Sequence, residues 1–120
     1  MQILGRRYDN GEAIRLHLDG DTIARVEPLT GAAAAGNSLH WLAPGFWDVQ
    51  VNGYLGQEFS SLKLTPEKVA EIVTLHYRFG VTRICPTLTT QSYEVLEHGM
   101  RQIAAACDDS GEIELLVAGI

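Results

Sequence analysis

The sequence has few of the features that mark nucleic-acid-binding or membrane proteins. Lys and Arg number only 9 against 15 Asp and Glu, so the 120 residues carry a net charge of −6. Nucleic acids and anionic membranes are bound through basic side chains that neutralise phosphates, so this balance argues against both partners. No apolar run reaches membrane-spanning length, and residues 1–7 lack the long apolar core of a signal peptide.

Cysteine is equally scarce. Cys85 and Cys107 are the only two, and they form no CxxC motif. This usage is typical of a reduced compartment, so we expect a cytoplasmic protein. No GxGxxG or P-loop motif follows any predicted strand, and nucleotide binding therefore has no support.

The composition that remains is that of an ordinary globular protein, with 46% hydrophobic and 20% charged residues. The length suffices for one domain but not for a closed eight-stranded α/β barrel, which needs about 250 residues. Residues 1–43 predict a partial small β-domain. Residues 44–120 predict the order strand, helix, strand, helix, strand, with strands beginning near residues 45, 81 and 113. That spacing fits barrel units of roughly 31 residues, and it also fits a doubly wound open sheet.

The N-terminal part reads as short strands. Ala13–Leu18 alternates between apolar and polar residues, Asp19–Asp21 predicts a hairpin turn, and Thr22–Glu27 predicts the return strand. His17 lies on the polar face, where we expect a solvated side chain. The Gly- and Ala-rich stretch 30–37 predicts a loop because it is short and has glycine at both ends.

Two helices are predicted in the second part. Thr65 and Pro66 begin the first, and Gly80 suits its C-terminal end. His76 is in line with its apolar stripe, which predicts a hydrogen-bonded, partly buried histidine and not a metal ligand. Between the helices, residues 81–88 predict a strand.

Thr89 or Thr90 is expected to cap the second helix. Its apolar stripe predicts Met100 and Cys107 as core residues, while His98 falls off the stripe and is expected to be exposed. A continuous apolar run predicts a third strand over residues 113–120.

The most informative stretch is the strand predicted over Phe46–Val51. Period-two alternation places Asp48, Gln50 and Asn52 on one face, and Asn52-Gly53 then turns the chain. Polar groups gathered at the carboxyl end of a strand are typical of ligand sites in parallel α/β folds. A half-buried strand closed by an ordinary Asn-Gly turn is the alternative. Residues 53–59 follow with two glycines, and we expect a plain connecting loop there.

The run Pro44-Gly45-Phe46-Trp47-Asp48-Val49-Gln50-Val51-Asn52-Gly53 resembles the first barrel strand of the amidohydrolase superfamily. Most members carry His-x-His where this chain has Gln50-Val51-Asn52. The Gln-x-Asn form is similar to one family within it, N-acetylglucosamine-6-phosphate deacetylase. Two further segments support the resemblance, residues 80–88 and 117–120, so it extends from about Pro44 to the end.

The resemblance implies a fold and a chemistry. The chain would be an N-terminal fragment holding the first three strands and two helices of a (β/α)8 TIM-type barrel, preceded by part of a small β-sandwich domain. The whole enzyme would be a metal-dependent hydrolase that converts N-acetylglucosamine 6-phosphate to glucosamine 6-phosphate and acetate. Its pocket would be lined by Gln50, Asn52, Gly53 and Thr87, with neutral amides where other members bind a first metal.

The resemblance also implies what this chain does not contribute. The family's metal ligands and its catalytic aspartate follow the Ala-Gly-Ile segment that ends at Ile120, so no catalytic residue and no ligand for zinc or a similar ion is expected in this chain. Alone, the fragment is expected to be inactive. The whole protein is expected to be a homodimer that acts on a small amino-sugar phosphate.

Two alternatives remain open from the residues. One is a fragment of another amidohydrolase, such as a dihydroorotase-like enzyme, that has lost its His-x-His pair. The other is a small α/β binding module without catalysis.

Overall fold

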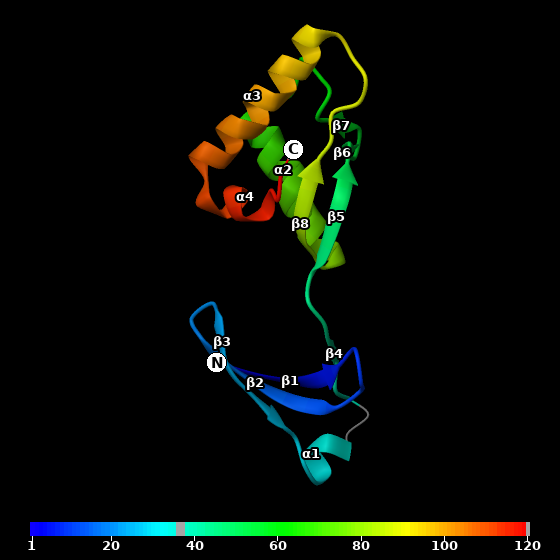
Figure 1. Cartoon of the computed structure of the whole chain (residues 1–120), viewed down its shortest axis with the longest axis vertical. Coiled ribbons are helices and arrows are strands. Elements are labelled where there is room, and N and C mark those ends of the chain that lie inside the picture. Colours follow the sequence, from blue (N-terminus) through cyan, green and yellow to red (C-terminus); the bar gives the residue numbers. More distant parts are fainter. Residues whose placement is uncertain (36–37, 120) are drawn as a thin grey trace. The chain divides into compact units, whose positions relative to one another are not determined.

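A computed structural model describes residues 1–35 and 38–119 of the protein. The chain divides into two compact units, Met1–Pro44 and Gly45–Ile120. Together they make a mixed α/β protein (Figure 1).

The first unit is built on a four-stranded sheet in the order β3-β2-β1-β4. The predicted hairpin is confirmed, because β2 and β3 pair antiparallel around a turn at Asp19–Asp21. β1 pairs antiparallel with β2 and parallel with β4, so the hairpin is extended into a larger sheet. The strands are β1 Gln2–Arg7, β2 Ala13–Asp19, β3 Thr22–Pro28 and β4 Trp41–Leu42.

Two predictions for this unit are wrong. Ala32–Ala35 forms a short helix, α1, where a loop was expected, and a guanidinium N–H of Arg6 donates to the carbonyl of Ala34 at 2.8 Å. Alanine has the highest helix propensity, and this hydrogen bond from outside the helix satisfies one of its end carbonyls. Residues 36 and 37 of the predicted loop lie outside the described residues. His17 is not solvated: its side chain is 20% exposed and pairs with Glu27 at 2.6 Å.

The second unit contains two parallel strands, β5 and β8, that lie side by side (Figure 1). Its core is one cluster of apolar side chains contributed by the strands and the helices. The helical segments are α2 Pro66–Leu75, the 3₁₀ turn η1 His76–Phe79, α3 Tyr93–Asp109 and α4 Gly111–Leu116. The strands are β5 Phe46–Val51, β6 Gly53–Tyr54, β7 Gln57–Glu58 and β8 Val81–Pro86.

Helix α2 begins as the sequence predicts, but it ends at Leu75, and the last predicted turn is the 3₁₀ segment η1 that Gly80 closes. The Thr65 side chain accepts a hydrogen bond from the backbone N–H of Lys68, and Pro66 occupies the first turn, where its missing donor is not needed. His76 follows directly and is buried, and its Nδ1 lies 2.7 Å from the carbonyl oxygen of Ile72. The predicted hydrogen bond of this histidine is confirmed, and the side chain is buried more fully than predicted.

Helix α3 exists, and its buried face overlaps the predicted stripe only in part. Gly99, Ile103 and Ala106 face the core, whereas Met100 is 51% exposed, so its prediction as core is wrong. Cys107 packs against the core as expected, although it is only partly buried. His98 is partly buried and bonds the carbonyl of Leu64 at 3.0 Å, which contradicts the exposed position expected for it.

The N-cap of α3 is also displaced from the prediction. Ser92 occupies it without a side-chain hydrogen bond, in place of Thr89 or Thr90. Gly99 explains the rotation of the buried face, because it lets the helix approach Leu88 and the backbone of Phe59 closely. Glycine has no side chain, so it does not count toward the apolar stripe in the sequence, although it can lie at a close packing contact.

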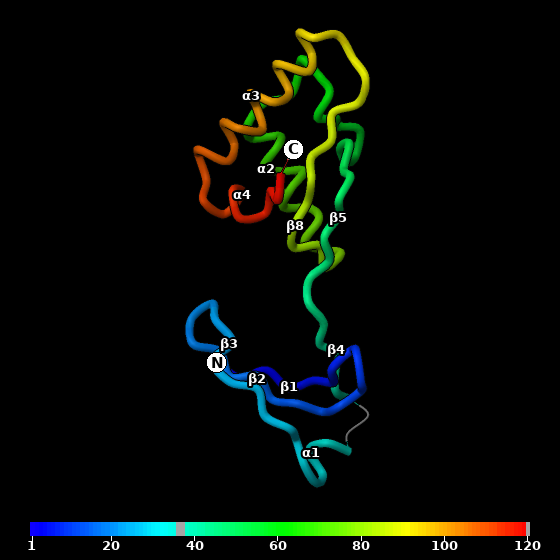
Figure 2. Tube along the Cα trace, viewed as in Figure 1, coloured from blue at the N-terminus to red at the C-terminus, as the bar shows by residue number. Residues whose placement is uncertain are grey.

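The third predicted strand is wrong over most of its length. Gly111–Leu116 forms helix α4, whose N-cap Ser110 accepts from the N–H of Ile113 at 3.4 Å. Ile113 and Leu116 are buried one helical turn apart, on the same face of this helix. Among the described residues of this segment, only Val117 makes a parallel bridge, to Ile84. Figure 2 shows the trace returning to β8 after α4; Ile120 lies outside the described residues.

In the described parts of the chain, none of the helices combines the length and the apolar character needed to cross a lipid bilayer.

Candidate functional site

Polar residues follow β5 and β8 where both parallel strands end. The two strand ends are joined because the N–H of Thr87 donates to the carbonyl of Val51 at 2.8 Å. Asn52 and Gly53 follow β5 directly. The carboxyl edge of parallel strands is where α/β proteins bind ligands, so this edge is the candidate site.

A small hairpin stands at this edge where a plain loop was expected. β6 and β7 pair antiparallel, with Gly53 opposite Glu58 and Tyr54 opposite Gln57. The two-residue turn between them has positive φ at Leu55 (50°) and Gly56 (79°), the pattern of a type I′ turn. Leucine seldom adopts this conformation, so the turn carries strain at an exposed position.

Gly53 is required for this arrangement. Its φ is 154°, and a Cβ at this position would overlap the carbonyl oxygen of Gln57 on the neighbouring strand. Any side chain would therefore push β7 away from β6. The sequence predicts a turn at the Asn-Gly pair. In the structure, its glycine allows the backbones of β6 and β7 to come close together at the edge of the site.

A cavity of about 570 Å³ opens beside the hairpin. Its volume is in the range that holds a small metabolite. Asn52 and Gly53, both predicted as site residues, line it, and the Asn52 side chain is exposed. The lining comprises residues Asn52, Gly53, Tyr54, Leu55, Gly56, Gln57, Glu58 and Thr89.

The other two predicted site residues lie elsewhere. Gln50 is exposed and is not among the residues that line this cavity. Thr87 lines a different cavity of about 450 Å³, together with Val49 and Met100, and its hydroxyl donates to the carbonyl of Cys85 at 3.1 Å. Asn52 and Gly53 therefore line one cavity, which Gln50 and Thr87 do not line although they lie close to it in the fold. The roles of all four stay predictions.

Sequence reasoning missed Tyr54, Glu58 and Thr89. The Tyr54 ring packs against His76 at 5.4 Å and Phe79 at 6.1 Å between ring centroids, so η1 supports this wall of the cavity. Tyr54 and Glu58 belong to the stretch that was expected to be a plain loop. Thr89 was assigned to a helix cap, and no local signal links it to Asn52.

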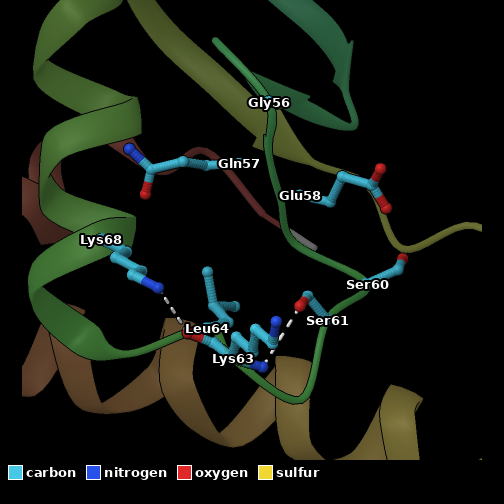
Figure 3. Close-up of a pocket in the computed structure, with 8 residues that line it drawn as sticks. All are labelled: Gly56, Gln57, Glu58, Ser60, Ser61, Lys63, Leu64 and Lys68. Carbon is cyan, nitrogen blue, oxygen red and sulfur yellow. Dashed lines mark hydrogen bonds between the residues drawn. The ribbon is translucent and has the colours of Figure 1, made fainter.

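A second cavity of about 270 Å³ shares Gly56, Gln57 and Glu58 with the first one (Figure 3). Ser60 joins the two regions, because its buried hydroxyl oxygen accepts from the N–H of Thr89 at 2.7 Å. Near the start of α2, a hydrogen bond from the Thr65 hydroxyl lowers the pKa of Glu67, so the helix begins with a carboxylate. This second cavity is lined by Gly56, Gln57, Glu58, Ser60, Ser61, Lys63, Leu64 and Lys68.

The described residues do not provide a metal centre. No three or more of their His, Cys, Asp and Glu side chains come together as a ligand set. A catalytic zinc ion needs about three such ligands, so a zinc site would require ligands from beyond the described residues.

Several curated proteins are similar to this chain in sequence. The N-acetylglucosamine-6-phosphate deacetylases of Bos taurus and Homo sapiens are each 46% identical to it over 66 residues, and that of Mus musculus is 43% identical over 65. Each match covers 52% of this chain and 15% of the relative, so the chain spans a small part of their length. No family model matches.

The fold has a close counterpart among solved structures. The crystal structure of N-acetylglucosamine-6-phosphate deacetylase from Pasteurella multocida superposes with a TM-score of 0.66 at 18% identity, covering 92% of this chain and 31% of that one. At this identity the likeness shows the fold alone. In sequence over about half its length, and in fold over nearly all of it, the chain resembles part of an N-acetylglucosamine-6-phosphate deacetylase.

Proposed function

We propose that this chain is part of an amidohydrolase that removes the acetyl group from N-acetylglucosamine 6-phosphate. In that reaction water cleaves a linear amide C–N bond and releases acetate and the free amine. We further propose that β5 and β8 belong to a (β/α)8 barrel whose remaining strands are supplied by sequence outside this chain.

The observation that carries the proposal is the place of Asn52. It directly follows β5, lines the 570 Å³ cavity and lies in the Gln-x-Asn segment that the resemblance singles out. An amide side chain offers both donors and an acceptor, which suits the hydroxyl and acetamido groups of an amino sugar. Its role would be to orient the substrate by hydrogen bonds.

A divalent metal is part of the proposal for the whole enzyme. Its ligands would come from residues outside this chain, so the 120 residues by themselves are proposed to be inactive.

The proposal is tested by measuring acetate release from N-acetylglucosamine 6-phosphate. The assay uses the natural protein that contains this chain. We expect Asn52→Ala to lower kcat/KM about ten- to a hundredfold, because one buried hydrogen bond to the substrate is lost. Arg101→Gln, on the exposed face of α3, is the control and should retain activity. Full activity of Asn52→Ala, or no acetate release by the natural protein, would refute the assignment.

A further inference from the structure

The smaller cavity concentrates positive charge in an acidic chain. Lys63 and Lys68 are the only lysines in the sequence, and both line this cavity of about 270 Å³. Neither forms an ion pair with any carboxylate among the residues that the structure describes. Two unneutralised ammonium groups beside one cavity favour an anion as its ligand.

The backbone holds one of these charges in place. The Lys68 ammonium donates to the carbonyl of Lys63 at 2.8 Å, which ties α2 to the preceding loop and leaves two N–H groups for a ligand. The Ser61 hydroxyl oxygen accepts from the N–H of Lys63 at 3.1 Å, and its own O–H remains available as a donor. Figure 3 shows both hydrogen bonds at the edge of the cavity.

Gln57 adds a buried acceptor. Its amide nitrogen donates to a carboxylate oxygen of Glu71 at 3.0 Å. This bond fixes the orientation of the amide, because a flipped amide would place its oxygen against the carboxylate oxygen. The other atom, Oε1, is buried, and no described residue donates to it. In Figure 3 this oxygen points toward the space beside Lys68. A buried acceptor without a donor costs free energy, so a donor on the ligand would be favoured here.

The remaining carboxylate at the cavity does not oppose an anion directly. Glu58 lines the rim and is exposed, and Figure 3 shows its carboxylate directed away from Lys68. The volume lies below the usual range for drug-sized ligands, which limits the ligand to a small molecule.

We propose that this cavity binds a phosphate group that carries a hydrogen-bond donor, with the charge held by Lys63 and Lys68 and the donor received by Gln57. The donor is either the P–OH of the free ion or a hydroxyl of a small phosphate monoester. Sulfate has the same shape and charge but no donor at neutral pH, so the site discriminates against it. The proposal concerns a second cavity and does not rest on the deacetylase assignment.

The experiment uses the 120-residue chain labelled with ¹³C-lysine, whose two Cε resonances report on the cavity directly. The chain is titrated with inorganic phosphate, sodium sulfate and glucose 6-phosphate at matched ionic strength. We expect both resonances to shift with phosphate until the site is saturated. Sulfate should bind about tenfold more weakly, because it cannot make one charge-assisted hydrogen bond. Tighter binding of glucose 6-phosphate than of phosphate identifies a monoester site, and the reverse identifies a site for the free ion.

Three variants separate the site from general charge effects. Lys63→Gln removes an exposed charge and should weaken phosphate binding several-fold, whereas Arg101→Gln removes an equal charge elsewhere and should leave it unchanged. Gln57→Met should abolish the preference for phosphate over sulfate. Any one of three results would overturn the proposal. These are shifts that fail to saturate, equal affinity for the two anions, and equal effects of Lys63→Gln and Arg101→Gln. If Gln57→Met does not fold, the phosphate-to-sulfate ratio of the unmodified chain decides.

Discussion

The hydroxyl oxygen of Ser60 accepts a hydrogen bond of 2.7 Å from the backbone N–H of Thr89, 29 residues further along the chain. This bond connects the segment after β5 to the segment after β8. Ser60 is only 6% exposed, while Thr89 lines the cavity that Asn52 also lines. One buried hydroxyl therefore holds together two sides of the candidate site.

Replacing Ser60 with Ala should destabilise the chain by about 1 kcal/mol, because the bond is lost in a buried setting. Ser61→Ala is the matched control: its hydroxyl accepts from Lys63 in an exposed setting, so a change within about 0.5 kcal/mol is expected. Urea denaturation measures both. In addition, the ¹⁵N chemical shift of Thr89 should move in Ser60→Ala alone. An unchanged Thr89 resonance would mean that the bond does not form in solution.

Replacing Gly99 with Ala should destabilise the chain by about 1–3 kcal/mol despite the better helix propensity of alanine. The added Cβ would lie 2.5 Å from Cδ2 of Leu88 and 2.7 Å from the carbonyl oxygen of Phe59, and the backbone oxygen cannot easily move. Gly111→Ala is the control, since nothing lies within 4 Å of a Cβ there. A stabilised Gly99→Ala variant in urea unfolding would show that α3 does not pack so closely.

Replacing Leu55 with Asn should stabilise the β6–β7 hairpin by about 0.5–1 kcal/mol. Leu55 has a φ of 50°, a conformation that costs a leucine about 1–2 kcal/mol and that asparagine tolerates better. Its side chain is 76% exposed, so little packing is lost. Thermal unfolding compares the variant with Leu62→Asn, another exposed leucine. A lower melting temperature for Leu55→Asn than for the unmodified chain would contradict the turn geometry.

The first unit should lose stability in acid through Glu27. The hydrogen bond from His17 is the largest cause that lowers the pKa of Glu27 below its usual value of 4.5, and the charge of Arg25 adds to it. A carboxyl whose folded pKa is lowered contributes stability above its unfolded pKa, and that stability is lost as the pH falls through the folded pKa. Melting temperatures measured between about pH 3 and 6 should show this loss, and Glu27→Gln should remove it.

The matched control for that experiment is Glu94→Gln, which changes an exposed glutamate of the second unit. It should leave the acid-dependent loss in place. An identical pH profile for Glu27→Gln and the unmodified chain would show that the His17–Glu27 pair contributes nothing to folding.

Cys107 should react slowly with alkylating reagents while the chain is folded. Burial is the largest cause that raises the pKa of its thiol above 9.0, and the carboxylates of Glu114 and Asp108 add to it. The reactive thiolate is therefore scarce at neutral pH. In a Cys85→Ala chain, iodoacetamide should modify Cys107 about tenfold more slowly in buffer than in denaturing urea. Equal rates in both solvents would show that the C-terminal end of α3 is open.

Local signals were enough to predict several elements. The turn at Asp19–Asp21, the cap at Thr65 and the extent of β5 all follow from residues that are neighbours in the chain, and the structure agrees with them. The burial of His76 followed from helical periodicity. These features depend on backbone preferences within a few residues, so the sequence by itself determined them.

Tertiary packing decided the rest. On α3, Gly99 is buried and Met100 is exposed, because the helix packs closely at Gly99. Ile113 and Leu116 are buried by a helix where an apolar run predicted a strand. The packing of separate elements also brings Ser60 to its hydrogen bond with Thr89. It likewise places Lys63, Lys68 and Gln57 around one cavity. Periodicity shows that a face is apolar, but which neighbour covers it, and which polar groups then share a cavity, is determined only when the elements come together.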